Sequence, residues 1–270
     1  MKSVMKTLIS IYFILYILLI LPSALPAFFE GCDLDIYTAY KQYKTDHIWN
    51  RQGKKINIHN DFRQREYQLF ADYYFTRNDC LSLHSSFVEI EEILNRNTRG
   101  FTDPELIWTH CFYSNGTESL CTELTAIIPV AGQKHELRYG RFGGELGLYY
   151  STCVDLSSHP VYFDATLGYR AYSGYPSDQI RNTFIVGSYL LPGFYLEGRT
   201  DLHFGVFNGK SHMHHPLVFF NANYRLLKAQ IRGVLNIYSG FYVSLGCFGH
   251  VWGQNVGTGG GFLTEAWFVF

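Results

Sequence analysis

The sequence GGGFLTEAWFVF at residues 259–270 alternates in a way that favours a β-strand, because successive side chains of a strand point to opposite faces. One face would carry Phe262, Thr264, Ala266, Phe268 and Phe270. The other would carry Leu263, Glu265, Trp267 and Val269. An aromatic strand end is expected where one face meets lipid, whereas in water it would be an aggregation-prone edge. The stretch therefore favours the closing strand of a membrane barrel, with Phe268 and Phe270 as a C-terminal assembly signal.

The opening residues 1–27 have the pattern of a secretory signal peptide. A lysine-bearing start precedes an apolar stretch from Leu8 to Leu21, and small residues follow up to Ala27. The apolar stretch is shorter than the roughly 20 residues that a membrane-spanning helix requires. We expect cleavage after Ala27 and export of residues 28–270 through the general secretory route. A retained membrane anchor and a lipoprotein anchored at Cys32 are the alternatives.

The composition narrows the class of protein further. A net charge of −1 gives no indication of a nucleic-acid partner. Aromatic residues make up 17% of the chain, yet the mean hydropathy is only −0.05, which is too low for a bundle of membrane helices. A transmembrane barrel combines these two properties, because its lumen face is polar and its aromatic residues gather at the two membrane interfaces.

Two segments show the alternation most clearly: GFYLEGRTDLHFG at residues 193–205 and PVYFDATLGYRAY at residues 160–172. In each, one face is apolar and the other bears charges of both signs, as expected for a lumen in which charges find partners. The predicted lumen-lining residues are Asp164, Arg170, Glu197, Arg199, Asp201 and His203. They would form either a selectivity constriction or a structural ion-pair network. Phe163, Leu167, Leu196, Leu202 and Phe204 would face outward. A water-soluble β-sandwich also alternates and is the alternative fold.

Similar segments recur along the whole mature chain, separated by turn residues. They number thirteen, and because an even number is expected, the division of residues 216–238 into two strands is the weakest assignment. We therefore predict an all-β fold, a transmembrane antiparallel up-and-down barrel of about twelve strands spanning residues 28–270. Long external loops are expected at residues 44–60, 91–101, 130–143, 173–179, 207–215 and 251–258.

Four stretches resemble one family of proteins. They are EYQLFADYYFTRNDCLSL (66–83), FTDPEL (101–106), GYRAYSGYPSDQIRN (168–182) and GQNVGTGGGFLTEAWFVF (253–270). Together they are similar to the exported outer-membrane transporters associated with the MetA pathway of phenol degradation. The chain departs from that pattern at ADYYFTRND, where the family shows Y-G-L-T-D, and at Gln254-Asn255, where Arg-Asn is usual. The resemblance implies an outer-membrane barrel and transport, and it brings no catalytic or ligand residues.

The six cysteines allow disulfides in an oxidising compartment. Cys111 and Cys121 are equidistant from Gly116, so a hairpin turning there would set them opposite one another, while buried free thiols are the alternative. No zinc-type Cys spacing occurs. The three histidines in SHMHH (211–215) could hold a transition metal, although a polar external loop explains them as well.

Taken together, these features predict a passive channel or transporter for small solutes in the outer membrane of a Gram-negative bacterium. A structural or surface-interaction barrel without an open pore is the alternative. The expected partners are the lipid bilayer, the barrel-insertion machinery and an unknown small solute, with no nucleic acid, metal or cofactor. No nucleophile with a base is recognisable, so an enzyme is not expected.

Overall fold

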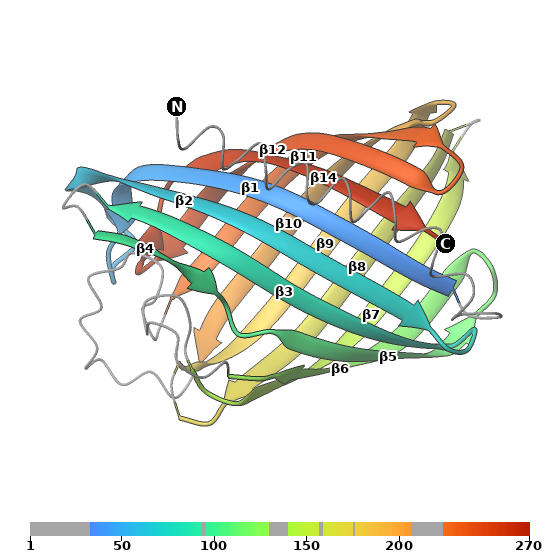
Figure 1. Ribbon diagram of the computed structural model, residues 1–270, viewed down its shortest axis with the longest axis horizontal. Coiled ribbons are helices and arrows are strands. Elements are labelled where there is room, and N and C mark those ends of the chain that lie inside the picture. The colour runs from blue at the N-terminus through green and yellow to red at the C-terminus, as the bar shows by residue number, and fades with distance from the viewer. Residues whose placement is uncertain (1–32, 93–95, 130–139, 157–158, 175, 207–223) are drawn as a thin grey trace.

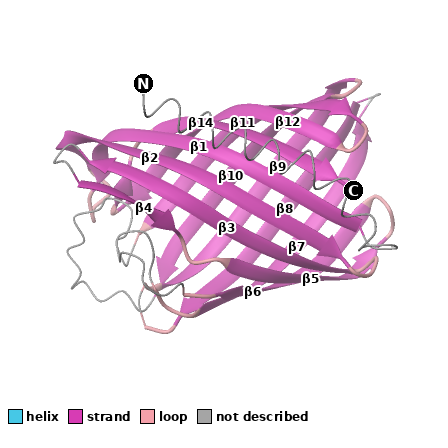
Figure 2. Cartoon of the chain, in the orientation of Figure 1, coloured by secondary structure: helices cyan, strands magenta, loops and turns pink. Residues whose placement is uncertain are grey.

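The computed structural model describes residues 33–92, 96–129, 140–156, 159–174, 176–206 and 224–270. Regular structure in these residues consists of strands (Figure 2). The strands are β1 (Asp33–Trp49), β2 (Lys55–Tyr74), β3 (Asp79–Glu92), β4 (Arg96–Phe101), β5 (Glu105–Ser114), β6 (Glu118–Ile127), β7 (Gly143–Leu156), β8 (His159–Tyr172), β9 (Asp178–Leu191), β10 (Phe194–Val206), β11 (Arg225–Tyr238), β12 (Phe241–Gln254), β13 (Val256–Gly257) and β14 (Gly260–Val269). Within the described ranges, no helix is long and apolar enough to cross a bilayer.

The strands form one antiparallel sheet that closes on itself (Figure 1). Neighbours in sequence are neighbours in the sheet, and β1 pairs on one side with β2 and on the other with β14. β4 and β5 both pair with β3 and make one interrupted wall strand, as β13 and β14 do beside β1. The fourteen strands thus make a wall of twelve, which confirms the predicted barrel and excludes the sandwich.

The weakest strand assignment concerned residues 216–238. Residues 225–238 form the single strand β11, which pairs with both β10 and β12. Residues 216–223 lie outside the described residues, as do the predicted signal peptide and the loop histidines 212–215.

The expected long loops at residues 44–60, 91–101 and 251–258 are wrong. β1 and β2 continue their ladder to a tight turn, in which the Asn50 side chain accepts hydrogen bonds from the amides of Gln52 and Lys54 at 2.9 Å. Residues 96–101 form β4, and β12 passes into β13 through Asn255, whose φ of 54° makes a one-residue turn. The strands lengthen because the extended pairing continues through polar residues that a hydropathy pattern assigns to loops.

The two faces of the wall differ as the alternation predicts. The outward side chains are large and apolar, and Leu167, Leu148 and Leu245 expose 56%, 52% and 68% of their surface. Side chains that are directly opposite in neighbouring strands share a face, so the register carries this division from strand to strand around the barrel. An apolar surface of this extent is stable in lipid and would be an aggregation hazard in water.

The outward surface changes character near the end of the barrel that bears the β1–β2 turn. Tyr40 and Tyr67 pack together on adjacent strands with ring centroids 5.2 Å apart. Arg65, which lies on β2 two residues closer than Tyr67 to the β1–β2 turn, forms an ion pair with Glu91 at 2.9 Å. Tyrosine rings beside charged groups mark the interface between hydrocarbon and headgroups in membrane barrels.

Inside this same end, a small apolar cluster narrows the barrel. Tyr43, Phe62, Val88 and Ile90 are each at most 5% exposed. Phe248 packs against them from β12, which is separated from β1 by β14. The cluster belongs to β1–β3 and β12. Elsewhere the interior mixes polar side chains with single buried apolar ones, such as Val234 and Leu263. We call this the loop end of the barrel and the end with Asp33 and Phe270 the terminal end (Figure 1).

Leu167→Arg tests the outward face. A charged side chain at mid-bilayer costs about 2–4 kcal/mol, and near the interfaces about 0–1 kcal/mol. We expect Leu167→Arg to lower the free energy of unfolding by the larger amount and Leu156→Arg, at the turn-side end of β7, by the smaller amount. Urea unfolding in vesicles, followed by tryptophan fluorescence, measures both. Equal losses for the two variants would contradict the assignment of Leu167 to lipid.

Candidate functional site: the charged interior of the barrel

The predicted charged face of β10 points into the barrel. Glu197 and Asp201 are each only 4% exposed. The register sets Glu197 opposite Arg232 and Asp201 opposite Lys228 on β11. Directly opposite residues lie close enough for side chains of opposite charge to pair.

The first interior cluster centres on Arg232. Its Nε lies 2.7 Å from Glu197 Oε1, its Nη2 donates to Glu197 Oε2 at 2.9 Å, and its Nη1 donates to Glu265 of β14. Ser244 donates to the Glu265 carboxylate at 2.6 Å, and Tyr37 donates to it from β1. One guanidinium therefore joins strands on both sides of β11 and β12, and each buried carboxylate receives more than one donor.

Tyr162 contributes to the first cluster from β8. Its hydroxyl donates to Glu197 Oε2 at 2.9 Å. The ring lies across Gly187 of the intervening strand β9, where an added Cβ would lie 2.2 Å from the Tyr162 ring. Glycine at position 187 thus leaves the room that this contact needs.

The second cluster centres on Asp201. Arg199 Nε donates to its Oδ1 at 2.8 Å, Thr183 Oγ1 donates to the same oxygen at 3.0 Å, and Lys228 Nζ lies 3.0 Å from Oδ2. The carboxylate is saturated by neighbours on three strands, so its burial does not leave an uncompensated charge.

The third cluster spans the interior more widely. Arg170 of β8 donates through both terminal nitrogens to Glu105 of β5, at 2.6 and 3.0 Å, and through Nε to Glu145 of β7 at 2.5 Å. Arg170 is 7% exposed, and its side chain bridges β8 to β5 over the inner surface of β6 and β7. Gly168 makes room beside it, because a Cβ there would lie 2.5 Å from a Glu145 oxygen.

His203 extends this third cluster through Arg181. Arg181 Nη1 lies 3.2 Å from Glu145 Oε2, and its Nη2 lies 3.3 Å from His203 Nε2. A guanidinium only donates, so His203 Nε2 accepts, and its Nδ1 is left to donate to the Tyr224 hydroxyl at 3.0 Å.

The structure distributes the six predicted lumen residues unequally. It brings Glu197, Arg199 and Asp201 together with β11, and it joins Arg170 and His203 through Glu145 and Arg181. Asp164 lies apart from these clusters and accepts a hydrogen bond from Tyr149 at 3.1 Å.

Six charged residues of these clusters were not predicted from the sequence: Glu105, Glu145, Arg181, Lys228, Arg232 and Glu265. Lys228 and Arg232 were detectable, because they alternate with Ala229 and Ile231 in the same period of two. The alternation places Glu265 on the face of the closing strand opposite Phe268 and Phe270, and the structure shows that this face points inward. The sequence does not show the register that pairs these residues across strands.

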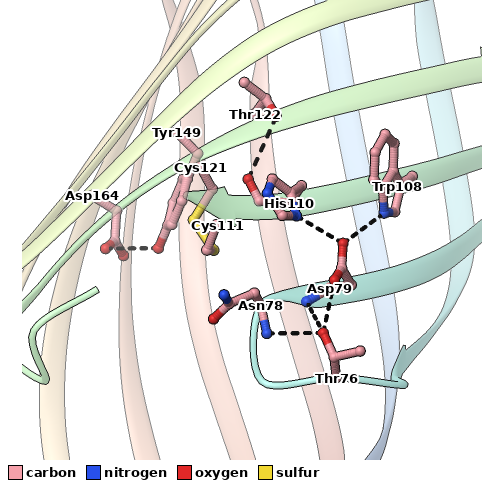
Figure 3. The surroundings of a disulfide bond; sticks show 10 residues. All are labelled: Thr76, Asn78, Asp79, Trp108, His110, Cys111, Cys121, Thr122, Tyr149 and Asp164. Carbon is pink, nitrogen blue, oxygen red and sulfur yellow. Dashed lines mark hydrogen bonds and ion pairs between the residues drawn. A yellow bond between two sulfur atoms is a disulfide. The ribbon is translucent and has the colours of Figure 1, made fainter. Parts of the chain in front are cut away.

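Near the terminal end, Cys111 of β5 and Cys121 of β6 form a disulfide (Figure 3). They are directly opposite in the ladder, on either side of the Asn115–Gly116 turn. Beside them, His110 Nδ1 and Trp108 Nε1 converge on Asp79 Oδ1 at 2.8 and 3.2 Å. The disulfide and the Asp79 contacts fasten the β5–β6 hairpin and tie it to β3.

Phe268 and Phe270 lie on the outward face of the chain end. Phe268 stacks on Phe241 of β12 with centroids 4.4 Å apart, and Phe270 lies 6.2 Å from Phe268. The three rings form an aromatic group on the outer surface at the terminal end. Among the residues that the structure describes, no group of three or more His, Cys, Asp or Glu side chains is arranged to hold a metal ion.

Arg232→Met should be strongly destabilising, because it leaves Glu197 and Glu265 buried without a cation. Breaking a buried pair from one side costs about 3–5 kcal/mol. Arg65→Met, which breaks the half-exposed outer pair with Glu91, should cost less than about 1 kcal/mol. Urea unfolding of the two variants makes the comparison. Partial recovery in the triple variant Arg232→Met/Glu197→Gln/Glu265→Gln is also expected, and similar small losses for both arginines would contradict the burial of the first cluster.

Removing the disulfide with Cys111→Ser/Cys121→Ser should lower the free energy of unfolding by about 2–3 kcal/mol, as expected for a cross-link that closes a short loop. Cys153→Ser, which removes an exposed free thiol, is the matched control and should change stability little. Alkylation without reductant should leave Cys111 and Cys121 unlabelled. Labelling of both in the native protein would contradict the bond.

Comparison with known proteins agrees with this architecture. No family model matches the sequence, and no curated protein matches it either. Among solved structures, the chain is similar to the COG4313 outer membrane channel from Pseudomonas putida F1, with 13% identity over 88% of this chain and 95% of that chain and a TM-score of 0.71. It is less similar to the NanC porin, at 8% identity over 86% and 98% with a TM-score of 0.51, and to the KdgM porin, at 8% identity over 86% and 99% with a TM-score of 0.50. The chain thus has the fold of outer-membrane channels and porins.

Proposed function

We propose that this protein is a passive channel for small solutes in the outer membrane of a Gram-negative bacterium. The observation that carries the proposal is a closed wall with large apolar side chains on its outer face and charged, hydrogen-bonding side chains on its inner face. A barrel with this division presents a polar path through lipid. The resemblance in fold to channels and porins supports the same reading.

The location and route are part of the proposal. The signal-like residues 1–27 support export through the general secretory route, and the outward apolar band supports residence in the bilayer. The outward aromatic group at Phe268 and Phe270 supports recognition by the barrel-insertion machinery. We propose a non-catalytic role, because the sequence presents no recognisable pairing of a nucleophile with a base.

A finer proposal comes from the sequence resemblance to the transporters associated with the MetA pathway of phenol degradation. It would make the solute a small organic molecule. The resemblance covers the stretches 66–83, 101–106, 168–182 and 253–270, which, apart from residue 175, fall on described strands and the turns beside them.

A structural barrel without an open pore is the second candidate, and one observation favours it. The Arg170 side chain crosses two strands to reach Glu105, and Tyr43, Phe62 and Phe248 fill space at the loop end. Side chains that bridge the interior in this way stiffen a barrel and reduce its free cross-section.

Conductance across a planar bilayer separates the two candidates. Refolded protein should give discrete, stepwise currents in KCl, and boiled protein, as the control, should give none. A change in gel mobility on boiling establishes that the sample was folded. Folded protein that inserts and never conducts would contradict the channel and favour the structural barrel.

A further inference from the structure

The described inward-facing bases are confined to one part of the wall, whereas inward acids occur all around it. Among the side chains that the structure describes, the inward-facing Lys and Arg within the wall come from β1 and from β8–β11. They are Lys41, Arg170, Arg181, Arg199, Lys228 and Arg232. The wall from β2 to β7 carries inward acids instead, beside the one imidazole of His84. These acids are Glu66, Asp72, Glu105, Glu123 and Glu145.

The basic groups are nearly all engaged by carboxylates. Arg232 binds two glutamates, Arg170 binds two, and Arg181 shares Glu145 with Arg170. Arg199 and Lys228 share Asp201. Lys41 stands directly opposite Glu66 on β2, and the Gln68 amide donates to the same carboxylate at 2.8 Å. Each described positive charge of the interior therefore has a carboxylate on its own strand or on a nearby strand.

Among the described residues the inward acids outnumber the inward bases, and most of the surplus lies toward the terminal end. Among the described inward acids, those with neither an ion-pair partner nor a directly opposite cation are Asp33 at the rim, Asp35, Asp72, Glu123 and Asp164. Asp35 and Asp72 lie two residues from the terminal-end limits of their strands and Asp164 lies five residues from that of β8, whereas Glu123 lies in the middle of β6. Asp35 and Asp72 are directly opposite on β1 and β2, so their carboxylates share one patch of the lining.

The partners of these acids are neutral. Asp164 accepts from the Tyr149 hydroxyl at 3.1 Å, and no described Lys or Arg lies within ion-pair distance of Glu123. Hydroxyl donors stabilise a carboxylate and leave its charge in place. In a narrow, low-dielectric passage, fixed charge of one sign concentrates counter-ions and repels co-ions.

We infer that the barrel is a cation-selective channel whose selectivity is set by the carboxylates of its lining that have no ion-pair partner. The inference rests on the proposed channel function and adds the class of solute: small inorganic or organic cations pass in preference to anions of similar size. The paired clusters around Arg170, Asp201 and Arg232 hold the wall and contribute little net charge. Asp35, Asp72, Glu123 and Asp164 give the passage its sign.

Reversal potential in a tenfold KCl gradient tests the inference. The wild-type channel should show a K⁺ over Cl⁻ permeability ratio above one, by roughly severalfold for a lining of this net charge. Glu123→Gln/Asp164→Asn should lower the ratio at least about twofold while the channel still conducts. Glu89→Gln is the matched control, because Glu89 lies on the outward face at the loop end, and it should leave the ratio unchanged.

The outcomes are distinguishable. A conducting wild-type channel that prefers Cl⁻, or a double variant with an unchanged ratio, overturns the cation selectivity and leaves the channel function standing. A folded barrel that does not conduct overturns the channel function and the selectivity with it. All variants are checked for the mobility shift on boiling. Should the double variant not fold, Asp72→Asn, which changes a separate strand, replaces it with the same expected fall.

Discussion

A backbone amide or carbonyl that faces hydrocarbon has no water with which to bond, and this constraint governs the whole molecule. A sheet satisfies it only by closing, and closure here depends on the pairing of β1 with β14 along Asp35–Lys44 and Gly260–Val269. Gly259 precedes the last strand and Gly260 and Gly261 begin it, and an added Cβ on Gly261 would lie 1.6 Å from the Gln42 carbonyl oxygen. The glycines thus allow the two ends of the sheet to approach, after which every wall strand has two neighbours.

Closure in turn fixes what each side chain can do. Because side chains alternate and the closed sheet has no free edge, every residue of a wall strand must face either lipid or the interior. A charged residue placed on the lipid-facing set of positions therefore cannot avoid the lipid. Buried charges in the interior are stable where donors and acceptors are matched. Arg170, Asp201 and Arg232 meet that condition, with distances of 2.5, 3.0 and 2.7 Å to Glu145, Lys228 and Glu197, respectively. Asp35, Asp72, Glu123 and Asp164 have no cation partner among the described residues, and we assign this to function.

Much of the fold is predictable from the sequence, because alternation is a local property. The β8 and β10 segments, their inward and outward faces and a wall of about twelve strands follow from it. The pairing of Cys111 with Cys121 follows from symmetry about one turn. Strand ends do not follow, since residues 44–49 and 55–60 extend the ladder with polar side chains that resemble a loop.

The ion-pair clusters are harder to predict. Which carboxylate meets Arg170 depends on registers across β5–β8, and the Glu105 contact skips two strands entirely. No spacing in the chain encodes that distance. The residue types can be found from the sequence, whereas their partners require the closed sheet.

The division of each strand between lipid and lumen is the claim from which the rest follows, and spin labels along β10 test it directly. Single cysteines at positions 199–204, introduced into a variant with the native free thiols removed, would carry the label one residue at a time. We expect labels at 199, 201 and 203 to be accessible to an aqueous nickel chelate and labels at 200, 202 and 204 to be accessible to lipid-soluble oxygen. An inverted pattern, or accessibility without a period of two, would contradict the lumen lining and the barrel wall described above.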